Sequence, residues 1–155
     1  MELYLLRHAD AETVAQSDDE RFLSEKGMQQ SQRVARFCEA HEIKPDIIFS
    51  SPLRRTHQTA AIVADKLRVE LKTVRWLGCG AQASDMLAQI REYRNLPSLM
   101  LVGHEPDLGL FTAFMIGTGH GENIHVRKGA LIKLSVAEFA EAGASLEFLL
   151  PPKLL

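Results

Sequence analysis

Two basic side chains, Arg7 and His8, end the first apolar segment of the chain. This segment, residues 3–6, reads Leu-Tyr-Leu-Leu and is followed at once by charged residues. Four apolar residues in a row suit a strand buried on both faces, as in a parallel sheet covered by helices. In such sheets ligands bind at the carboxyl ends of the strands. A neutral imidazole there can act as a nucleophile, and a neighbouring guanidinium can bind phosphate oxygens in a forked geometry.

Two later apolar segments end in polar groups of the same kind. Residues 47–49 lead into a predicted helix for which Ser51 is the expected N-cap. Arg55 then lies close to the positive end of the helix dipole, which is an anion-binding position. Residues 99–102 form the third segment, and His104 follows it. The carboxyl ends of three strands thus offer four candidate site residues to one edge of one sheet: Arg7, His8, Arg55 and His104.

Apolar periodicity predicts the elements that would position these side chains. Helical spacing of apolar residues predicts helices that begin near Ser24, Pro52, Ser84 and Pro106. On the first of these helices, Met28 and Cys38 are expected on the buried face. Further strands are predicted over residues 69–76, 130–136 and 145–150, the last two pairing antiparallel at the sheet edge. The pattern therefore predicts an α/β fold with a mostly parallel sheet.

Length, composition and charge exclude several classes of protein. A chain of 155 residues with 46% hydrophobic residues suits one domain over residues 1–155. The formal charge of −2 and the pI near 6.3 give no broad basic field, which argues against nucleic-acid binding. No segment has the length of a membrane span or the pattern of a signal peptide, so we expect a cytoplasmic protein. We also expect the protein to be a monomer. Two cysteines, Cys38 and Cys79, are too few for a disulfide framework.

Other polar residues suggest sites only weakly. His120 and His125 lack acidic or cysteine partners at a metal-ligand spacing, so we predict no metal and no cofactor. The polar segment of residues 9–23 is long for a connection inside a compact domain and begins at the presumed site, which is typical of functional loops. Whether His57, His120, His125 and Lys128 line the mouth of the site stays open at this stage.

The order of these motifs resembles the histidine phosphatase superfamily, also called phosphoglycerate mutase-like. The resemblance rests on Arg7-His8-Ala9, on the segment Ser-Pro-Leu-Arg-Arg-Thr-His-Gln-Thr at residues 51–59, and on Val-Gly-His-Glu-Pro at residues 102–106. It spans nearly the whole chain, and the short length is most similar to the small SixA-type phosphohistidine phosphatases. The resemblance implies a three-layer α/β/α sandwich and a covalent phosphohistidine intermediate. In that scheme His8 is the nucleophile, and Arg7, Arg55, His104 and Ser51 bind the phosphoryl group.

One feature of the family has no clear counterpart in this sequence. Larger members have an acidic residue that protonates an alkoxide leaving group, and here only Glu105 and Asp85 are candidates, neither in a recognisable motif. Phosphoramidates need such a donor less, because the phosphorus–nitrogen bond is labile. The sequence therefore favours a phosphohistidine-bearing protein as substrate. The alternatives are a phosphomonoesterase for a small phosphoester and a non-catalytic phosphate-binding module.

Overall fold

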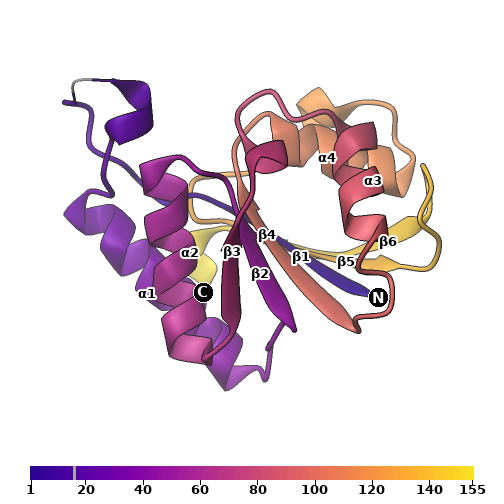
Figure 1. The fold of residues 1–155 in the computed structure, drawn as a ribbon, viewed down its shortest axis with the longest axis horizontal. Helices are drawn as coiled ribbons and strands as arrows, with labels where there is room; N and C mark the ends of the chain where they lie inside the picture. The colour runs from indigo at the N-terminus through magenta and orange to yellow at the C-terminus, as the bar shows by residue number, and fades with distance from the viewer. Residues whose placement is uncertain (16) are drawn as a thin grey trace.

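A six-stranded sheet forms the centre of the protein in a computed structural model that describes residues 1–15 and 17–155. The strand order is β3-β2-β4-β1-β5-β6 (Figure 1). The four parallel strands are β1 (Glu2–Arg7), β2 (Ile47–Ser50), β3 (Glu70–Thr73) and β4 (Ser98–Gly103). Strands β5 (Leu131–Val136) and β6 (Ala144–Leu150) extend the sheet antiparallel. The predicted antiparallel edge is confirmed.

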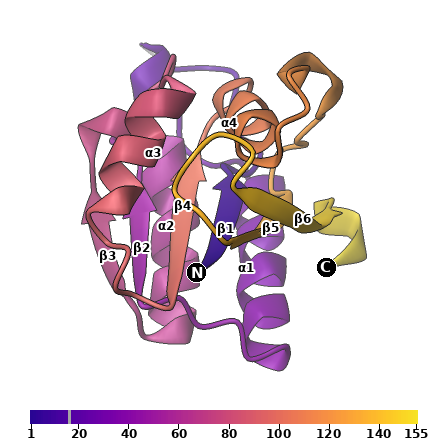
Figure 2. The same cartoon turned by 90° about the vertical axis from the view of Figure 1, so that its right-hand side faces the viewer.

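Helices cover both faces of the sheet. Helices α1 (Glu25–Ala40) and α2 (Arg54–Leu67) form one layer, and α3 (Ala83–Arg91) and α4 (Asp107–Ile116) form the other (Figures 1 and 2). Successive strand residues point to opposite faces, so Tyr4 of β1 packs in the core beneath α1 and α2 while Leu5 packs beneath α3 and α4. The fold is a three-layer α/β/α sandwich, as predicted.

Helix α1 begins where expected but buries a different face. The Ser24 hydroxyl caps the helix by accepting a hydrogen bond from the Gly27 amide at 3.1 Å. The buried stripe runs from Gly27 through Val34 to Cys38, and Gly27 packs against the backbone of Asp10. Met28 is one residue, about 100° of rotation, away from this stripe and is 45% exposed. The prediction of a buried Met28 was wrong, whereas that of a buried Cys38 is confirmed.

Two further predicted boundaries were wrong. Only Glu70–Thr73 pairs with β2, because the chain then turns into a short 3₁₀ helix at Arg75–Leu77. Helix α2 begins at Arg54 with Leu53 as N-cap, so Ser51 lies before the cap and its hydroxyl is available to the site. The other 3₁₀ turns are Asp18–Glu20, Gly121–Asn123 and Pro152–Leu154.

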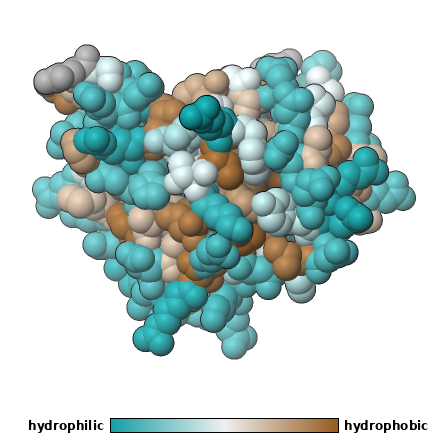
Figure 3. All heavy atoms as spheres, in the orientation of Figure 1, coloured by the Kyte–Doolittle hydropathy of each residue, from teal (hydrophilic) through white to brown (hydrophobic). Residues whose placement is uncertain are grey.

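Hydrophilic side chains dominate the surface in the view of Figure 3, with hydrophobic residues in small groups between them. Among the helices that the structure describes, none is both long and apolar enough to cross a membrane.

Candidate active site

The four candidate residues lie at the carboxyl ends of adjacent parallel strands. Beyond the end of β1, the His8 amide donates to the Gly103 carbonyl of β4 at 3.0 Å. Likewise the Ser51 amide, just beyond β2, donates to the Val102 carbonyl at 3.1 Å. These bonds continue the ladder past the strand ends, and the rings of His8 and His104 come within 5.4 Å of each other, centroid to centroid. The sheet therefore gathers the segments that bear the candidate residues.

His8 is a buried, neutral imidazole with a defined tautomer. Its Nδ1 lies 2.8 Å from the Ala9 carbonyl oxygen, which can only accept, so Nδ1 bears the proton and Nε2 keeps a free electron pair. Burial lowers the pKa of His8 to about 3, and the charges of His104, Arg55 and Arg7 act in the same direction, against the Ala9 hydrogen bond. His8 thus meets the electronic requirement for a nitrogen nucleophile at neutral pH.

Side chains of α2 hold the backbone around His8. The Thr59 hydroxyl accepts from the Ala9 amide at 3.1 Å and donates to the Arg55 carbonyl at 2.8 Å. Gln58 accepts from the Leu23 amide at 2.8 Å, which attaches the 9–23 segment to the same helix. The Gln-Thr pair of the motif at residues 51–59 is therefore a positioning pair that links α2 to both ends of this segment.

Arg7 is anchored by a carbonyl group. Its Nη1 donates to the Val126 carbonyl at 2.8 Å. Burial lowers the pKa of Arg7, and the carboxylate of Glu105 opposes that effect. Among the described residues no carboxylate is hydrogen-bonded to the guanidinium, so its N–H groups are available to an anion.

Arg55 is engaged by a residue that the sequence did not single out. Its Nη1 donates to the Asp18 carbonyl at 2.7 Å and its Nη2 to the Asp18 carboxylate at 3.0 Å. Arg21 binds the other oxygen of the same carboxylate at 2.8 Å. Slight burial opposes ionisation of Asp18, but Arg55 and then Arg21 hold the pKa of its carboxyl below the usual value. Arg55 is 3% exposed, so this interaction occurs at a buried guanidinium.

His104 contacts two hydroxyl groups of the second motif. Its Nε2 lies 2.7 Å from Ser51 Oγ and 3.4 Å from Thr56 Oγ1. Burial lowers the pKa of His104 to about 4; Arg55 and Arg7 contribute to the decrease, and Asp18 opposes it. A phosphate dianion in contact with the ring would shift this pKa upward and favour the donor form.

Three buried nitrogen atoms at the site have no hydrogen-bond partner among the described residues: Arg7 Nε, Arg55 Nε and His104 Nδ1. Buried polar groups are almost always satisfied in folded proteins. A ligand composed of acceptor oxygens is the type of group that such donors fit, which agrees with an oxyanion site.

The two weak candidates for a proton donor lie in different settings. Glu105 accepts from the amides of Gly109 and Val126 at 3.3 Å each, and burial raises the pKa of its carboxyl. It thereby supports the segment whose carbonyl anchors Arg7. Asp85 lies exposed on the first turn of α3 and lines a hollow with Arg75 and Cys79, with no bond to a candidate site residue. Of the two, only Glu105 adjoins the site.

The remaining singled-out residues are placed as follows. Cys79 is exposed as a residue, and the partial loss of water around its thiol raises the pKa of that thiol, so the thiolate is disfavoured. His57 lies 3.2 Å from the Thr73 hydroxyl, and Lys128 pairs with Asp10 at 2.9 Å. Within the described residues, no three His, Cys, Asp or Glu side chains are grouped so as to hold a metal ion.

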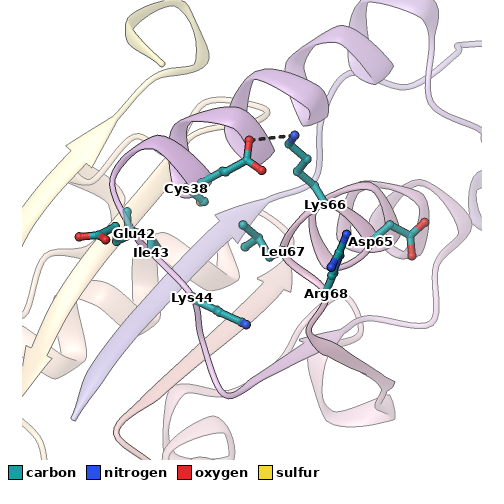
Figure 4. Close-up of a pocket in the computed structure, with 9 residues that line it drawn as sticks. Cys38, Glu42, Ile43, Lys44, Asp65, Lys66, Leu67 and Arg68 are labelled. Carbon is teal, nitrogen blue, oxygen red and sulfur yellow. Dashed lines mark ion pairs between the residues drawn. The ribbon is translucent and has the colours of Figure 1, made fainter.

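A separate hollow of about 650 Å³ lies at the amino end of the sheet, between the ends of α1 and α2 (Figure 4). Two of its charged residues, Lys66 and Glu39, form an ion pair with 2.8 Å between Nζ and Oε2. None of the four candidate residues lines it. The site at the carboxyl ends of the strands is therefore independent of this hollow.

Sequence comparison places the chain among known relatives. Residues 3–78 match the profile of the Histidine phosphatase superfamily (branch 1). An uncharacterized protein of Picosynechococcus sp. is 31% identical over 139 residues, which cover 86% of this chain and 84% of that protein.

Structural comparison extends the likeness over nearly the whole chain. A SixA protein from Agrobacterium tumefaciens has a TM-score of 0.84 at 26% identity, with 97% of each chain covered. The protein histidine phosphatase SixA in complex with tungstate has a TM-score of 0.87 at 21% identity, with 99% and 98% covered. The α-ribazole phosphatase from Shigella flexneri has a TM-score of 0.82 at 17% identity, with 98% and 97% covered. All share the α/β fold described above.

Proposed function

Because the chain belongs to the histidine phosphatase superfamily, we propose that it is a phosphatase that removes phosphoryl groups from phosphohistidine on proteins, with His8 as nucleophile. The observation that carries the proposal is the tautomer of His8. Its Nδ1–H donates to the Ala9 carbonyl oxygen, and the low pKa of the ring leaves Nε2 unprotonated beside two arginines. A SixA protein of the same fold was solved in complex with tungstate, a tetrahedral oxyanion like phosphate, which supports a phosphoryl ligand for this fold.

In the first step of the proposed reaction, Nε2 of His8 attacks phosphorus and the bond to the substrate imidazole breaks. A substrate ring that is protonated on its distal nitrogen leaves as neutral imidazole, so no donor has to supply a proton to it. Arg7, Arg55 and His104 hold the phosphoryl oxygens, on which charge builds up in the transition state. The absence of an acidic group hydrogen-bonded to His8 in the described structure fits a leaving group of this kind.

In the second step, water attacks the phosphorus of the phosphoenzyme and the bond to Nε2 breaks. The oxygen of water becomes part of inorganic phosphate, which keeps both protons of that water as dihydrogen phosphate. His8 returns to the neutral form with its proton on Nδ1. The Ala9 carbonyl holds the ring in one orientation through both steps.

A small-molecule phosphomonoesterase is the second candidate, and two observations favour it. The α-ribazole phosphatase shares the fold, and the raised pKa of Glu105 is a property expected of a general acid. Both oxygens of Glu105, however, accept backbone hydrogen bonds, which favour the charged form. This second candidate requires that Glu105→Gln abolish hydrolysis of alkyl phosphates.

The test measures kcat/KM of the purified protein on a phosphohistidine peptide, an aryl phosphate and a sugar phosphate, without added metal. We expect the phosphohistidine peptide to react fastest. Trapping of a labelled phosphoenzyme by a denaturing quench at alkaline pH, in the wild type and in His8→Ala, separates catalysis from mere phosphate binding. A sugar phosphate that reacts much faster than the peptide would overturn the assignment of a protein substrate, and an absence of phosphoenzyme would overturn catalysis by His8.

A further inference from the structure

A hollow of about 470 Å³ adjoins the candidate site on the side of Arg7. We call it the basic groove. Its lining comes from the end of β1, the first turns of α1, the segment that precedes β5, and the chain after β6. The residues are Arg7, Asp10, Lys26, Gln30, His125, Arg127, Lys128, Pro151, Pro152 and Lys153.

The basic groove has a strong excess of positive charge. Besides Arg7, four lysine and arginine side chains line it, against one carboxylate, Asp10. That carboxylate is already bound by Lys128 at 2.9 Å and by the Ser24 hydroxyl at 2.8 Å. The other three cations of the lining, Lys26, Arg127 and Lys153, form no ion pair within the described chain. In a protein whose net charge is −2, such an imbalance is local and points to an anionic ligand.

Arg7 connects the basic groove to the phosphate site. Its guanidinium is anchored on the Val126 carbonyl, and the neighbours of Val126 in sequence, His125 and Arg127, line the groove. A phosphoryl group held by Arg7 would therefore adjoin the groove. Residues adjacent to a phosphorylated side chain would extend along it, toward Lys26 and Lys153.

We propose that the basic groove binds an acidic segment of the phosphoprotein substrate, next to its phosphohistidine. This inference rests on the proposed function. Carboxylates spaced along a chain match cations that are contributed by separate segments of the lining, and Lys26, Arg127 and Lys153 are all exposed to an approaching protein. A small phosphosugar, in contrast, is normally bound in an enclosing pocket.

The test compares two phosphohistidine peptides that differ only in flanking residues, three glutamates in one and three glutamines in the other. An aryl phosphate, which is too small to reach Lys26 or Lys153, serves as reference substrate. The variants are the double charge reversals Lys26→Glu/Lys153→Glu and Lys26→Glu/Arg127→Glu. Lys44→Glu, which makes a single charge reversal outside the groove, is the control, because Lys44 is an exposed lysine at the amino end of the sheet. Thermal unfolding of each variant verifies that it is folded.

We expect the wild type to prefer the acidic peptide by about tenfold in kcat/KM, since several exposed ion pairs act together, and to lose the preference at high salt. The double variants should lose or reverse this preference, and Lys44→Glu should keep it. Equal rates on the two peptides would overturn the inference and leave the proposed function intact. If the wild type hydrolyses the aryl phosphate but neither peptide, the proposed protein substrate itself is wrong. A charge-dependent preference for a small bisphosphate over both peptides would assign the groove to a second phosphate and overturn the inference too.

Discussion

The two arginines of the site are held by different kinds of partner. Arg7, at the end of β1, donates to a backbone carbonyl, whereas Arg55, in the first turn of α2, donates to the carbonyl and carboxylate of Asp18. A neutral partner positions Arg7, and the nearby Glu105 carboxylate interacts with its charge without a hydrogen bond among the described residues. An ionised partner positions Arg55 and offsets its charge, so the Asp18 carboxylate competes with a phosphoryl group for Nη2, whereas Nε has no partner within the described structure.

This contrast divides the site into a strand side and a loop side. The strand side consists of Arg7, His8 and His104, which are fixed by the ends of β1 and β4. The loop side consists of Asp18 and Arg21, which belong to the 9–23 segment, where Asp18 is exposed. We infer that the strand side is pre-organised for the phosphoryl group and that the loop side adjusts when the substrate binds. The following changes test this division.

The largest effect is expected from a change on the strand side, His8→Asn. Without the imidazole no phosphoenzyme can form, and we expect kcat/KM to fall by at least about 10³-fold. His41→Asn is the matched control, since His41 is an exposed histidine at the far end of α1. Rapid-quench trapping together with steady-state kinetics measures the effect. A His8→Asn protein that still accumulates acid-labile phosphoenzyme would place the nucleophile elsewhere.

The two histidines of the strand side should also make the free energy of unfolding depend on pH in mild acid. The folded-state pKa values of His8 (about 3) and His104 (about 4) lie below the ordinary value near 6.5, so the unfolded chain binds more protons between these limits. This contribution to the free energy of unfolding is therefore complete above pH 6.5 and decreases as the pH falls. The slope is up to about 1.4 kcal/mol per pH unit for each histidine.

Urea unfolding at a series of pH values from 7 to 4.5 measures this slope. The double variant His8→Asn/His104→Asn should show a flatter dependence, because asparagine does not titrate. The same pH dependence in the wild type and the double variant between pH 6.5 and 5 would show that the two rings do not have lowered pKa values in the folded protein.

A third change acts where the two sides meet, at Gly27. A Cβ atom on this residue would lie only 1.9 Å from the carbonyl oxygen of Asp10, so Gly27→Ala must displace the start of the 9–23 segment or the first turn of α1. We expect a loss of about 1 to 3 kcal/mol in the free energy of unfolding. Gly78→Ala offers a comparison with a much milder contact, since the φ of Gly78 is −63° and the nearest atom to its Cβ position, the Arg75 carbonyl oxygen, lies at 3.2 Å. Urea unfolding of both variants tests this, and an unchanged stability of Gly27→Ala would contradict the contact.

The strand side is the part that the sequence predicts well. Each apolar segment ends in polar residues, and parallel strands place their carboxyl ends at one edge, so the proximity of His8 and His104 follows from topology alone. The loop side has no such pattern. Asp18 and Arg21 lie in a polar segment without periodicity, and nothing local indicates that a carboxylate there reaches Arg55, 37 residues away in sequence.

The contact made by the Ser51 hydroxyl group also could not be predicted from the sequence. Its position before an apolar helix predicts an N-cap, yet the helix begins later and the hydroxyl contacts His104 instead. A cap and a site ligand use the same oxygen, and only the exact start of the helix decides between them. Gln58 and Thr59 were visible as part of the motif, but their positioning role depends on partners in the 9–23 segment.

The smallest effect is expected from Asp18→Ala, which removes the carboxylate from Arg55. Because the carboxylate competes with an incoming anion, its loss should tighten binding of orthovanadate, a phosphate-like inhibitor. The gain should be at most about fivefold, since the Asp18 side chain is 61% exposed and solvent screens its charge. Asp19→Ala is the matched control for the change in net charge one residue further on. Inhibition constants from aryl phosphate hydrolysis measure the effect. If Asp18→Ala instead weakens inhibition while Asp19→Ala does not, Asp18 orients Arg55 toward the phosphoryl group, and the loop side is as pre-organised as the strand side.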